Sequence, residues 1–410
     1  MKIIDFSPFS TYPPRSGGQA RIFNLNLELS KYFDIFQFSF MPSTYSFVRK
    51  TRMLKLMFHE RGRNNLQIPL RSQTVNIRKG YAEYVFANLF FLFTAYSISK
   101  FKLPEVVPFK LDSSSFKIAK KRMEESDIVQ VESPWIFDWV YNNKPKNKPI
   151  ILVEHNVEHL MYEKQCKGMK LQRVKIMEKN AVEKADKIFA VSKDDLGILC
   201  AKYNVEKSKI NVIPNGVDVS RFRIASEKER EAVKNQFGFS DRRIALFVGS
   251  SHFPNVKAVE AIYDIAHKMK DYRVLFLVAG SVGEWVRKEK MDNILFTGFV
   301  DDVHSYFTMA DIAINPMFSG SGTNSKVLEY LSSGLPLITT EFGIRGLQLE
   351  NNKHILISKL EEFPDKIKEL ISDKEKCAAL NKEGRKLAEN QYNWKIIARE
   401  ALDLYEKALG

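Results

Sequence analysis

Short apolar runs that alternate with helical stretches constrain the fold of this chain more than any other feature. Runs such as DIVQVES and KPIILVEH in the first half, and RRIALFVGS and ADIAINPM in the second, have the length and composition of buried strands. Stretches such as ARIFNLNLELSKYF and NVKAVEAIYDIAHKMK repeat their apolar residues at helical spacing. The alternation predicts an α/β fold with parallel sheets, in which ligands bind beyond the carboxyl ends of the strands.

Pro214, Asn215 and Gly216 interrupt this alternation, and we place a domain boundary there. A chain of 410 residues is long enough for two domains that each have a core. We therefore expect two Rossmann-like, doubly wound domains that face each other across a cleft. The first comprises residues 1–215 and the second residues 216–391. A final helix, about 392–410, is expected to pack back on the first domain.

The charge is distributed unevenly between these halves. Residues 1–215 contain 35 basic and 21 acidic side chains, a net charge of +14, whereas residues 216–410 contain 28 of each. A basic first domain suits an anionic membrane surface, a phosphorylated acceptor or a nucleic acid, and it equally suits a merely solubilising surface. The sequence begins without a recognisable signal peptide, and its three cysteines are widely spaced. These features favour a reducing cytoplasm.

One segment departs from the alternating pattern. Residues 84–98, YVFANLFFLFTAYSI, contain no charged side chain and are flanked by basic residues. The segment is shorter than the roughly 20 residues that span a bilayer, so it is not a confident transmembrane helix. A helix that dips into the membrane surface and a buried core segment are both compatible with it.

The stretch SGSGTNSKVLEYLSSGLP, residues 319–336, is the strongest candidate for a ligand site. Its small residues come after a predicted strand, and Thr323 or Asn324 is expected to cap the next helix. Backbone N–H groups and the helix dipole at such a position stabilise a diphosphate. Lys326 adds positive charge, and Glu329 in the second turn is placed to accept two ribose hydroxyls. The alternative is a tight turn before a packing helix.

At these residues the chain resembles the retaining glycosyltransferases of family four, which have two Rossmann-like domains in the GT-B architecture. Their signature is a Glu, seven residues and a second Glu, succeeded by a small-residue helix and a Gly-x-Pro turn. Glu329 matches the second Glu, and LSSGLPLITT matches the small-residue helix and the turn after it. Ser321 stands where the first Glu is expected. That departure implies that the contacts to the donor sugar differ in part from those of the family.

Other landmarks of the family occur in the same order. FVGSSHFPNVKAVEAI resembles the first strand, loop and helix of the donor domain, with Lys257 as a phosphate-binding lysine and Ser250 in the place of an arginine. The backbone near Phe299 and Val300 is expected to line the base pocket. The resemblance thus implies a donor site formed by Gly249, Ser250, Lys257, Phe299, Val300, Ser321, Gly322, Thr323, Asn324, Ser325, Lys326 and Glu329.

In the first domain, PPRSGGQARIF resembles the family's glycine loop, which faces the acceptor and the donor phosphates. We assign this acceptor and phosphate loop to Arg15, Gly17, Gly18 and Arg21, because glycines allow close backbone approach and arginines bind phosphates. An ordinary turn before a helix is the alternative.

His155 ends the predicted strand KPIILVEH, and in the family a histidine at this place contacts the donor sugar. We predict His155 and Glu329 as the catalytic residues. A zinc pair formed by His155 and His159 is disfavoured, because Asn156 stands where the protease motif requires Glu and no third ligand is evident. A strand-end histidine bonded to the backbone is a further alternative.

We therefore predict a glycosyltransferase that transfers a hexose from a nucleotide-diphosphate sugar to a hydroxyl of a glycan or lipid-linked acceptor, and the resemblance implies that it retains the anomeric configuration. It requires no metal, since Asp301 and Asp302 are adjacent rather than spaced as Asp-x-Asp, and no cofactor beyond its co-substrate. We expect a role in cell-surface polysaccharide or lipopolysaccharide synthesis, at the inner face of the membrane.

Two other functions remain open at this point. One is a sugar-nucleotide epimerase of the same architecture, which is disfavoured because Ser321 replaces an acid. The other is a basic nucleic-acid-binding protein, which ranks last because no recognition motif or basic and aromatic repeat is present.

Overall fold

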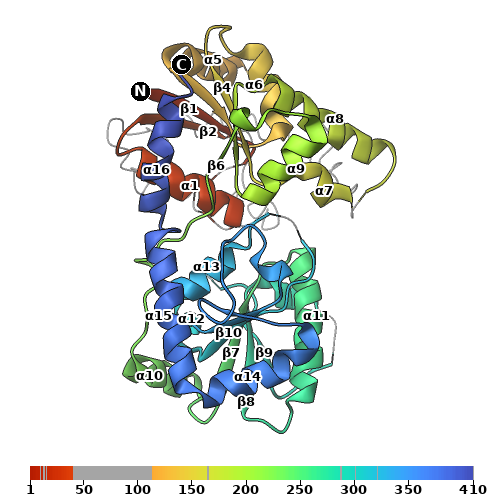
Figure 1. Cartoon of the computed structure of the whole chain (residues 1–410), viewed down its shortest axis with the longest axis vertical. Coiled ribbons are helices and arrows are strands. Elements are labelled where there is room, and N and C mark those ends of the chain that lie inside the picture. The colour runs from red at the N-terminus through yellow and green to blue at the C-terminus, as the bar shows by residue number, and fades with distance from the viewer. Residues whose placement is uncertain are drawn as a thin grey trace. The chain divides into compact units, whose positions relative to one another are not determined.

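The computed structural model describes residues 1–9, 11–12, 14, 16–39, 113–163, 166–286, 289–300, 302–320 and 322–409. Arg15, Asp301, Ser321 and the apolar segment 84–98 lie outside the described residues. The chain divides into two compact units (Figure 1): Met1–Ile213 with Ala398–Gly410, and Pro214–Ile397. Each unit is an α/β fold around one sheet.

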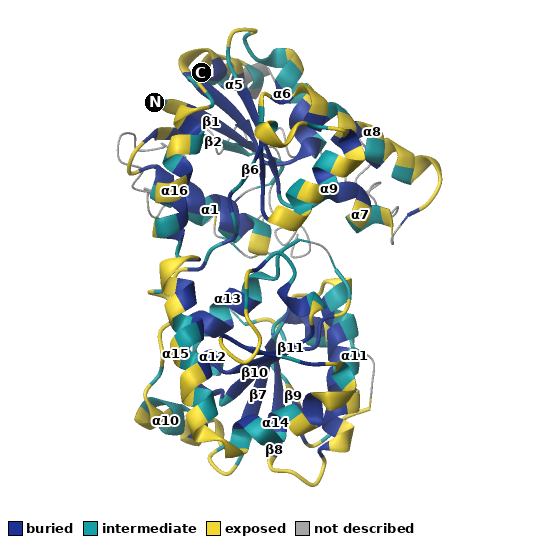
Figure 2. Cartoon of the chain, in the orientation of Figure 1, coloured by how far each residue is buried: buried dark blue, intermediate teal, exposed yellow. Residues whose placement is uncertain are grey.

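The first unit contains a six-stranded sheet in the order β2-β1-β3-β4-β5-β6, and all neighbouring strands pair in parallel. Its strands are β1 (Lys2–Ser7), β2 (Asp34–Ser39), β3 (Ile128–Val131), β4 (Ile150–Glu154), β5 (Lys187–Ala190) and β6 (Ile210–Val212). Its helices are α1 (Gly17–Leu29), α5 (Ser113–Glu125), α6 (Phe137–Asn143), α7 (Glu158–Glu163), α8 (Met169–Lys184) and α9 (Lys193–Tyr203). The central strands are buried on both faces, as the apolar runs predict (Figure 2).

The second unit repeats this plan with the strand order β12-β11-β10-β7-β8-β9, again entirely parallel. Its strands are β7 (Arg243–Val248), β8 (Val274–Ala279), β9 (Ile294–Phe296), β10 (Ile312–Asn315), β11 (Leu337–Thr339) and β12 (Leu356–Ile357). Its helices are α10 (Glu227–Phe237), α11 (Phe253–Lys268), α12 (His304–Met309), α13 (Ser325–Ser332), α14 (Phe363–Ser372) and α15 (Lys374–Asn390). Alternate residues of β7 enter two different apolar clusters, Ala245 and Phe247 in one and Ile244 and Leu246 in the other. Apolar cores therefore cover both faces of this sheet.

The last helix, α16 (Trp394–Glu406), contributes to both units, with Trp394–Ile397 in the second and the residues from Ala398 onwards in the first. In the second unit, Gly216 lies so close to the Trp394 ring that a Cβ there would be 2.7 Å from it. In the first unit, the Tyr405 hydroxyl donates to Oε1 of Gln130 at 2.7 Å.

The α/β prediction with two parallel sheets is confirmed, and the local differences are small. Helix α1 already begins at Gly17, because Ser16 accepts the Gln19 N–H as its N-cap, so the glycine pair forms the first helical turn rather than a loop. Strand β4 ends at Glu154, and His155 is therefore the first residue after it.

Three glycines lie where the loops at the carboxyl edge of the second sheet meet, and one of them, Gly280, permits their close approach. The Gly249 N–H donates to the Ala279 carbonyl at 2.9 Å, and the Gly280 N–H donates to the Gly298 carbonyl at 3.1 Å. Gly280 has a φ of 103°, and a Cβ on it would overlap the Gly249 carbonyl oxygen. Only glycine fits there, so the loops after β7, β8 and β9 form one continuous backbone surface.

We expect Gly280→Ala to lower the free energy of unfolding of the second unit by about 2–4 kcal/mol, because strain at a glycine-only φ adds to the steric overlap. Gly298→Ala is the matched control. Gly298 also has a positive φ, 68°, but a Cβ there would meet nothing within 4 Å, so its cost is about 1 kcal/mol. Denaturant unfolding followed by circular dichroism measures both, and equal losses would contradict the close approach of the loops.

Candidate active site

The loop after β10 is shaped by glycines and held by an arginine that the sequence did not reveal. Gly320 and Gly322 have φ values of 134° and 64°, a region that favours glycine. The Arg345 guanidinium donates to the Gly320 carbonyl at 3.2 Å and to the Gly322 carbonyl at 2.7 Å. These bonds occupy two loop carbonyls and fix the path of the backbone into α13.

Helix α13 begins without a side-chain cap. Asn324 occupies the N-cap position, but its side chain accepts no helix N–H and instead donates to Oδ1 of Asn315 at 3.3 Å. The prediction that Thr323 or Asn324 caps this helix is therefore wrong, because a buried asparagine on β10 takes the Asn324 amide. Among the described residues, the buried Thr323 hydroxyl has no partner. The N–H groups of Ser325 and Lys326 remain without intrahelical acceptors, as the first turn of any helix requires.

Lys326 connects α13 with the loop after β7. Its Nζ donates to Oδ1 of Asn255 at 2.7 Å and lies 4.3 Å from the centre of the Phe247 ring. Asn255 in turn donates to the Ser250 carbonyl at 2.9 Å. Burial lowers the pKa of Lys326 to about 7, and nearby Glu329 opposes this shift. The structure thus brings together Lys326 and Ser250, two predicted donor residues, through Asn255, which was not predicted.

Glu329 lies one helical turn beyond Lys326 and is partly buried. Burial raises the pKa of its carboxyl to about 7, while the positive charges of Arg221 and Lys326 act in the opposite direction. Arg221 was not identified from the sequence. The acid and the lysine both titrate near neutral pH, which is characteristic of functional sites.

The other predicted donor residues lie around the same sheet edge. Lys257, on α11, forms an ion pair with Glu260 at 2.8 Å, and its ammonium is 5.7 Å from the centre of the Phe253 ring. Phe299 and Val300 come directly after Gly298, and Phe299 is 40% exposed. The contacts of these residues with a donor stay predictions.

In the first unit, His155 contacts an acid from the neighbouring strand. Its Nε2 lies 2.7 Å from Oε2 of Glu132, the first residue after β3. The side chains are 14% and 4% exposed, respectively. Burial, assisted by the positive charge of Arg21, lowers the pKa of His155 to about 3, so the imidazole is neutral at physiological pH. Glu132 was missed, although residues at the ends of adjacent parallel strands meet at one edge.

The predicted phosphate loop of the first unit is a helix start. Gly17 and Gly18 are the first residues of α1. Arg21, one turn later, is buried and donates from Nη2 to the Ile213 carbonyl at 2.6 Å. Burial lowers the pKa of Arg21 only to about 10, so it remains a cation. Its contact with a phosphate stays a prediction.

His159 does not join His155 in a metal site. Its Nδ1 lies 2.7 Å from Oε2 of Glu178, and the Tyr203 hydroxyl contacts the same carboxylate. The two histidines therefore bond to different acids. Across the residues that the structure describes, no group of three or more His, Cys, Asp or Glu side chains is arranged to hold a metal ion.

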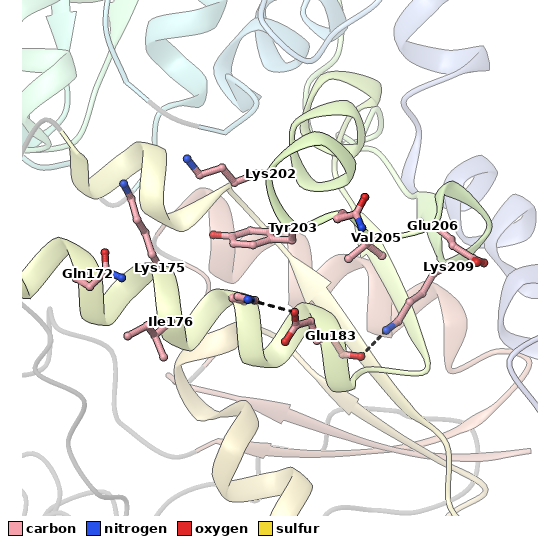
Figure 3. Close-up of a pocket in the computed structure, with 11 residues that line it drawn as sticks. Gln172, Lys175, Ile176, Glu183, Lys202, Tyr203, Val205, Glu206 and Lys209 are labelled. Carbon is pink, nitrogen blue, oxygen red and sulfur yellow. Dashed lines mark hydrogen bonds and ion pairs between the residues drawn. The ribbon is translucent and has the colours of Figure 1, made fainter.

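A basic groove of about 660 Å³ lies on the first unit beside α8 and the end of α9 (Figure 3). Lys175 and Lys202 extend toward it from these two helices. Lys209, the residue immediately before β6, also lines it and donates to the Glu183 carbonyl at 2.7 Å. In the part of the chain that is described, no helix is both long and apolar enough to cross a bilayer.

Two family models match the chain. Residues 92–221 match Glycosyltransferase Family 4, and residues 242–373 match Glycosyl transferases group 1, so that together the matches cover more than half of the chain. Among curated relatives, spore coat protein SA of Bacillus subtilis (strain 168) is 25% identical over 234 residues. That match covers 51% of this chain and 62% of the relative, less than two thirds of its length.

The capsular polysaccharide biosynthesis glycosyltransferase CapM of Staphylococcus aureus is 22% identical over 340 residues, which cover 75% of this chain and 86% of CapM. Among solved structures, HepE of Anabaena in complex with UDP superposes with a TM-score of 0.67 and 11% identity, covering 99% of this chain and all of HepE. That likeness shows a shared fold. With both family matches and the two parallel sheets, the chain belongs to the group 1 and family 4 glycosyltransferases of GT-B fold.

Proposed function

We propose that this glycosyltransferase transfers a hexose from a nucleotide-diphosphate sugar to a hydroxyl of a glycan or lipid-linked acceptor, with retention of the anomeric configuration. The observation that carries this proposal is the uncapped start of α13 with the Lys326 ammonium beside it. A relative named for capsular polysaccharide biosynthesis supports a product at the cell surface, either a polysaccharide, a lipopolysaccharide or a related glycoconjugate. The UDP bound to HepE supports a nucleotide donor.

The donor diphosphate is stabilised by protein groups. The free N–H groups of Ser325 and Lys326 and the dipole of α13 favour an anion at this place. The Lys326 ammonium is held by its hydrogen bond to Asn255 and adds a full positive charge. Lys257 provides a second positive charge. These groups offset the charge that develops on the leaving nucleotide, so the reaction proceeds without a metal ion.

The second unit provides the rest of the donor site. Glu329 accepts hydrogen bonds from two ribose hydroxyls, which requires its ionised form. The backbone at Phe299 and Val300 contacts the base. In the first unit, His155 bonds a hydroxyl of the donor sugar, and the glycine turn at Gly17 and Gly18 faces the phosphates and the acceptor.

The donor-site assignment is tested by thermal-shift measurements with UDP, GDP, ADP and their common sugars, without metal and then with magnesium. We expect selective stabilisation by one nucleotide. Glu329→Gln should weaken binding of that nucleotide by about 10- to 100-fold, since it removes hydrogen bonds to a charged group. Glu375 is exposed on α15, so Glu375→Gln is the control, and this variant should bind the nucleotide with the affinity of the wild type. Unchanged affinity and turnover in Glu329→Gln would remove the assignment.

The pKa of Lys326 near 7 makes nucleotide binding depend on pH. A bound diphosphate favours the protonated lysine, so binding raises this pKa. The contribution of Lys326 to the affinity is therefore greatest below pH 7 and falls as the pH rises above 7, by up to about tenfold per pH unit. The pKa of Glu329 is also about 7, and this group acts in the opposite direction, because the ionised carboxylate that accepts the ribose hydroxyls becomes more populated as the pH rises.

The variant Lys326→Met separates the two contributions, because it retains Glu329. We expect it to bind the nucleotide more weakly at pH 6 and to lose the part of the pH slope that Lys326 contributes. Isothermal titration calorimetry between pH 6 and pH 8.5 measures both. Parallel slopes in the wild type and the variant would show that Lys326 takes up no proton on binding.

We further propose that the first unit contacts an anionic membrane through α8 and the basic groove. Met169 and Ile176 on this helix are 80% and 50% exposed, and basic residues surround them: Lys170, Arg173, Lys175, Lys179 and Lys202. Apolar side chains beside several cations are the pattern of a surface that binds anionic lipid headgroups. This arrangement would place the enzyme at a lipid-linked acceptor.

Vesicle flotation at low salt tests the membrane contact. We expect binding to vesicles that contain anionic lipid and none to neutral vesicles. Lys175→Gln/Lys202→Gln should reduce the partition coefficient by about 30-fold, at roughly 1 kcal/mol for each lysine near the surface. Lys270→Gln/Lys374→Gln, which removes two exposed lysines from the second unit, is the charge-matched control. An equal loss in both variants would indicate an effect of net charge rather than of this surface.

A further inference from the structure

A buried chain of hydrogen bonds extends from His155 into the core of the first unit. Oε2 of Glu132 contacts the imidazole Nε2 at 2.7 Å, and Oε1 of the same carboxyl accepts from Nε2 of Gln130 at 2.7 Å. Oε1 of Gln130 accepts the Tyr405 hydroxyl at 2.7 Å. The NH₂ group of Gln130 donates to a carboxyl oxygen, so Oε1, at the other end of the amide, faces the Tyr405 hydroxyl and accepts from it.

A second acid shares this environment. Nε2 of Gln130 is also 3.2 Å from Oδ1 of Asp5 on β1, and Oδ2 of Asp5 accepts from Asn26 at 2.6 Å. Burial is the largest cause that raises the pKa of both acids, of Glu132 to about 7 and of Asp5 well above its ordinary value. The positive charge of Arg21 on α1 opposes the shift at Glu132.

The contact with Glu132 determines which nitrogen of His155 faces a ligand. Glu132 occupies Nε2, and Nδ1 is the ring nitrogen left for the substrate. When the carboxylate accepts the Nε2–H bond, a neutral ring has its lone pair on Nδ1. In that state Nδ1 accepts a hydrogen bond from a sugar hydroxyl. With the proton on Nδ1 instead, the ring would donate.

We propose that Glu132 is a positioning residue, which holds the proton of His155 on Nε2 and so presents Nδ1 to the substrate as a hydrogen-bond acceptor. Gln130 and Tyr405 anchor Glu132 in the required orientation. The tautomer assignment is independent of the reaction. Its consequence for turnover rests on the proposed role of His155 at the donor sugar.

The variant Glu132→Gln tests the assignment with the smallest change in shape. The NH₂ group of Gln130 requires an acceptor, so the new amide directs its oxygen to Gln130 and its own NH₂ group to His155. The ring must then accept at Nε2 and carry its proton on Nδ1. Glu132→Gln is thus expected to invert the tautomer rather than merely weaken a contact.

Long-range ¹H–¹⁵N NMR spectra of ¹⁵N-histidine-labelled protein report the tautomer directly, and His155→Gln assigns the signals by their loss. At pH 8 we expect the Nε2-protonated form in the wild type and the Nδ1-protonated form in Glu132→Gln. Glu158 is buried in the same unit but does not belong to this chain of hydrogen bonds. Glu158→Gln is therefore the control and should leave the His155 signals unchanged. A wild-type ring protonated on Nδ1 at pH 8, or no change in Glu132→Gln, would overturn the proposal.

The wild type alone provides a second test that does not depend on the folding of a variant. Lowering the pH from 8 to 6 protonates Glu132, whose O–H then donates to Nε2, and the ring proton moves to Nδ1. The groups that face Glu132 in this titration are Asp5, Arg21, Gln130, Tyr405 and His155. A ring that carries its proton on Nδ1 throughout this range would contradict the assignment.

Activity separates this proposal from the function on which it rests. If His155 contacts the donor sugar, Glu132→Gln lowers kcat by at least about tenfold, because an acceptor has become a donor. An inverted tautomer with unchanged turnover would support the positioning role of Glu132 and overturn the role of His155. An unchanged tautomer would overturn the positioning role whatever the activity.

Discussion

Parallel pairing of strands is the constraint on which both candidate sites depend. In a parallel sheet every carboxyl end lies at the same edge, so residues at the ends of different strands meet there without being near in sequence. In the first unit β3 and β4 pair directly, and Glu132 and His155 come immediately after them. In the second unit the residues after β7 and β10 meet in the same way, which places Ser250 near the loop that leads into α13.

Burial then changes the chemistry of the side chains that meet. An isolated ion loses its hydration inside a protein, so its neutral form is favoured unless charges or hydrogen bonds compensate. At Lys326, Glu329 and Glu132 the compensation is incomplete, and the pKa of each group comes to about 7. Each can therefore exchange a proton when a charged ligand arrives, which a fully solvated lysine or glutamate would not do near neutral pH.

The backbone contributes as much as the side chains. Gly280, at a positive φ, lets the loops after β7 and β8 approach each other, and Gly320 and Gly322 shape the loop before α13. Arg345 holds that loop through two carbonyls, and Asn315 removes the side chain that would otherwise cap the helix. The result is a helix start whose N–H groups remain available, and that availability gives an anion a place to bind.

Several parts of this arrangement are predictable from the sequence because they are local. The alternation of apolar runs and helical stretches predicts the two parallel sheets, and the order of motifs identifies the glycosyltransferase family. The small-residue loop with Lys326 and Glu329 one turn apart is likewise visible, because helical spacing relates residues three positions apart. The position of His155 at a strand end belongs to the same class of local signal.

The partners of these residues were decided by tertiary structure. Asn255 meets Lys326 across 71 positions of sequence, and Glu132 meets His155 across 23. No local pattern distinguishes these residues from other polar residues near strand ends, because their significance arises only from pairing across the sheet. The same reason explains the missing cap of α13, since the competing acceptor lies on β10. Sequence alone determined the fold and the position of the candidate ligand loop. Three-dimensional packing decided the protonation and the hydrogen bonds of its residues, because long-range contacts and burial set both.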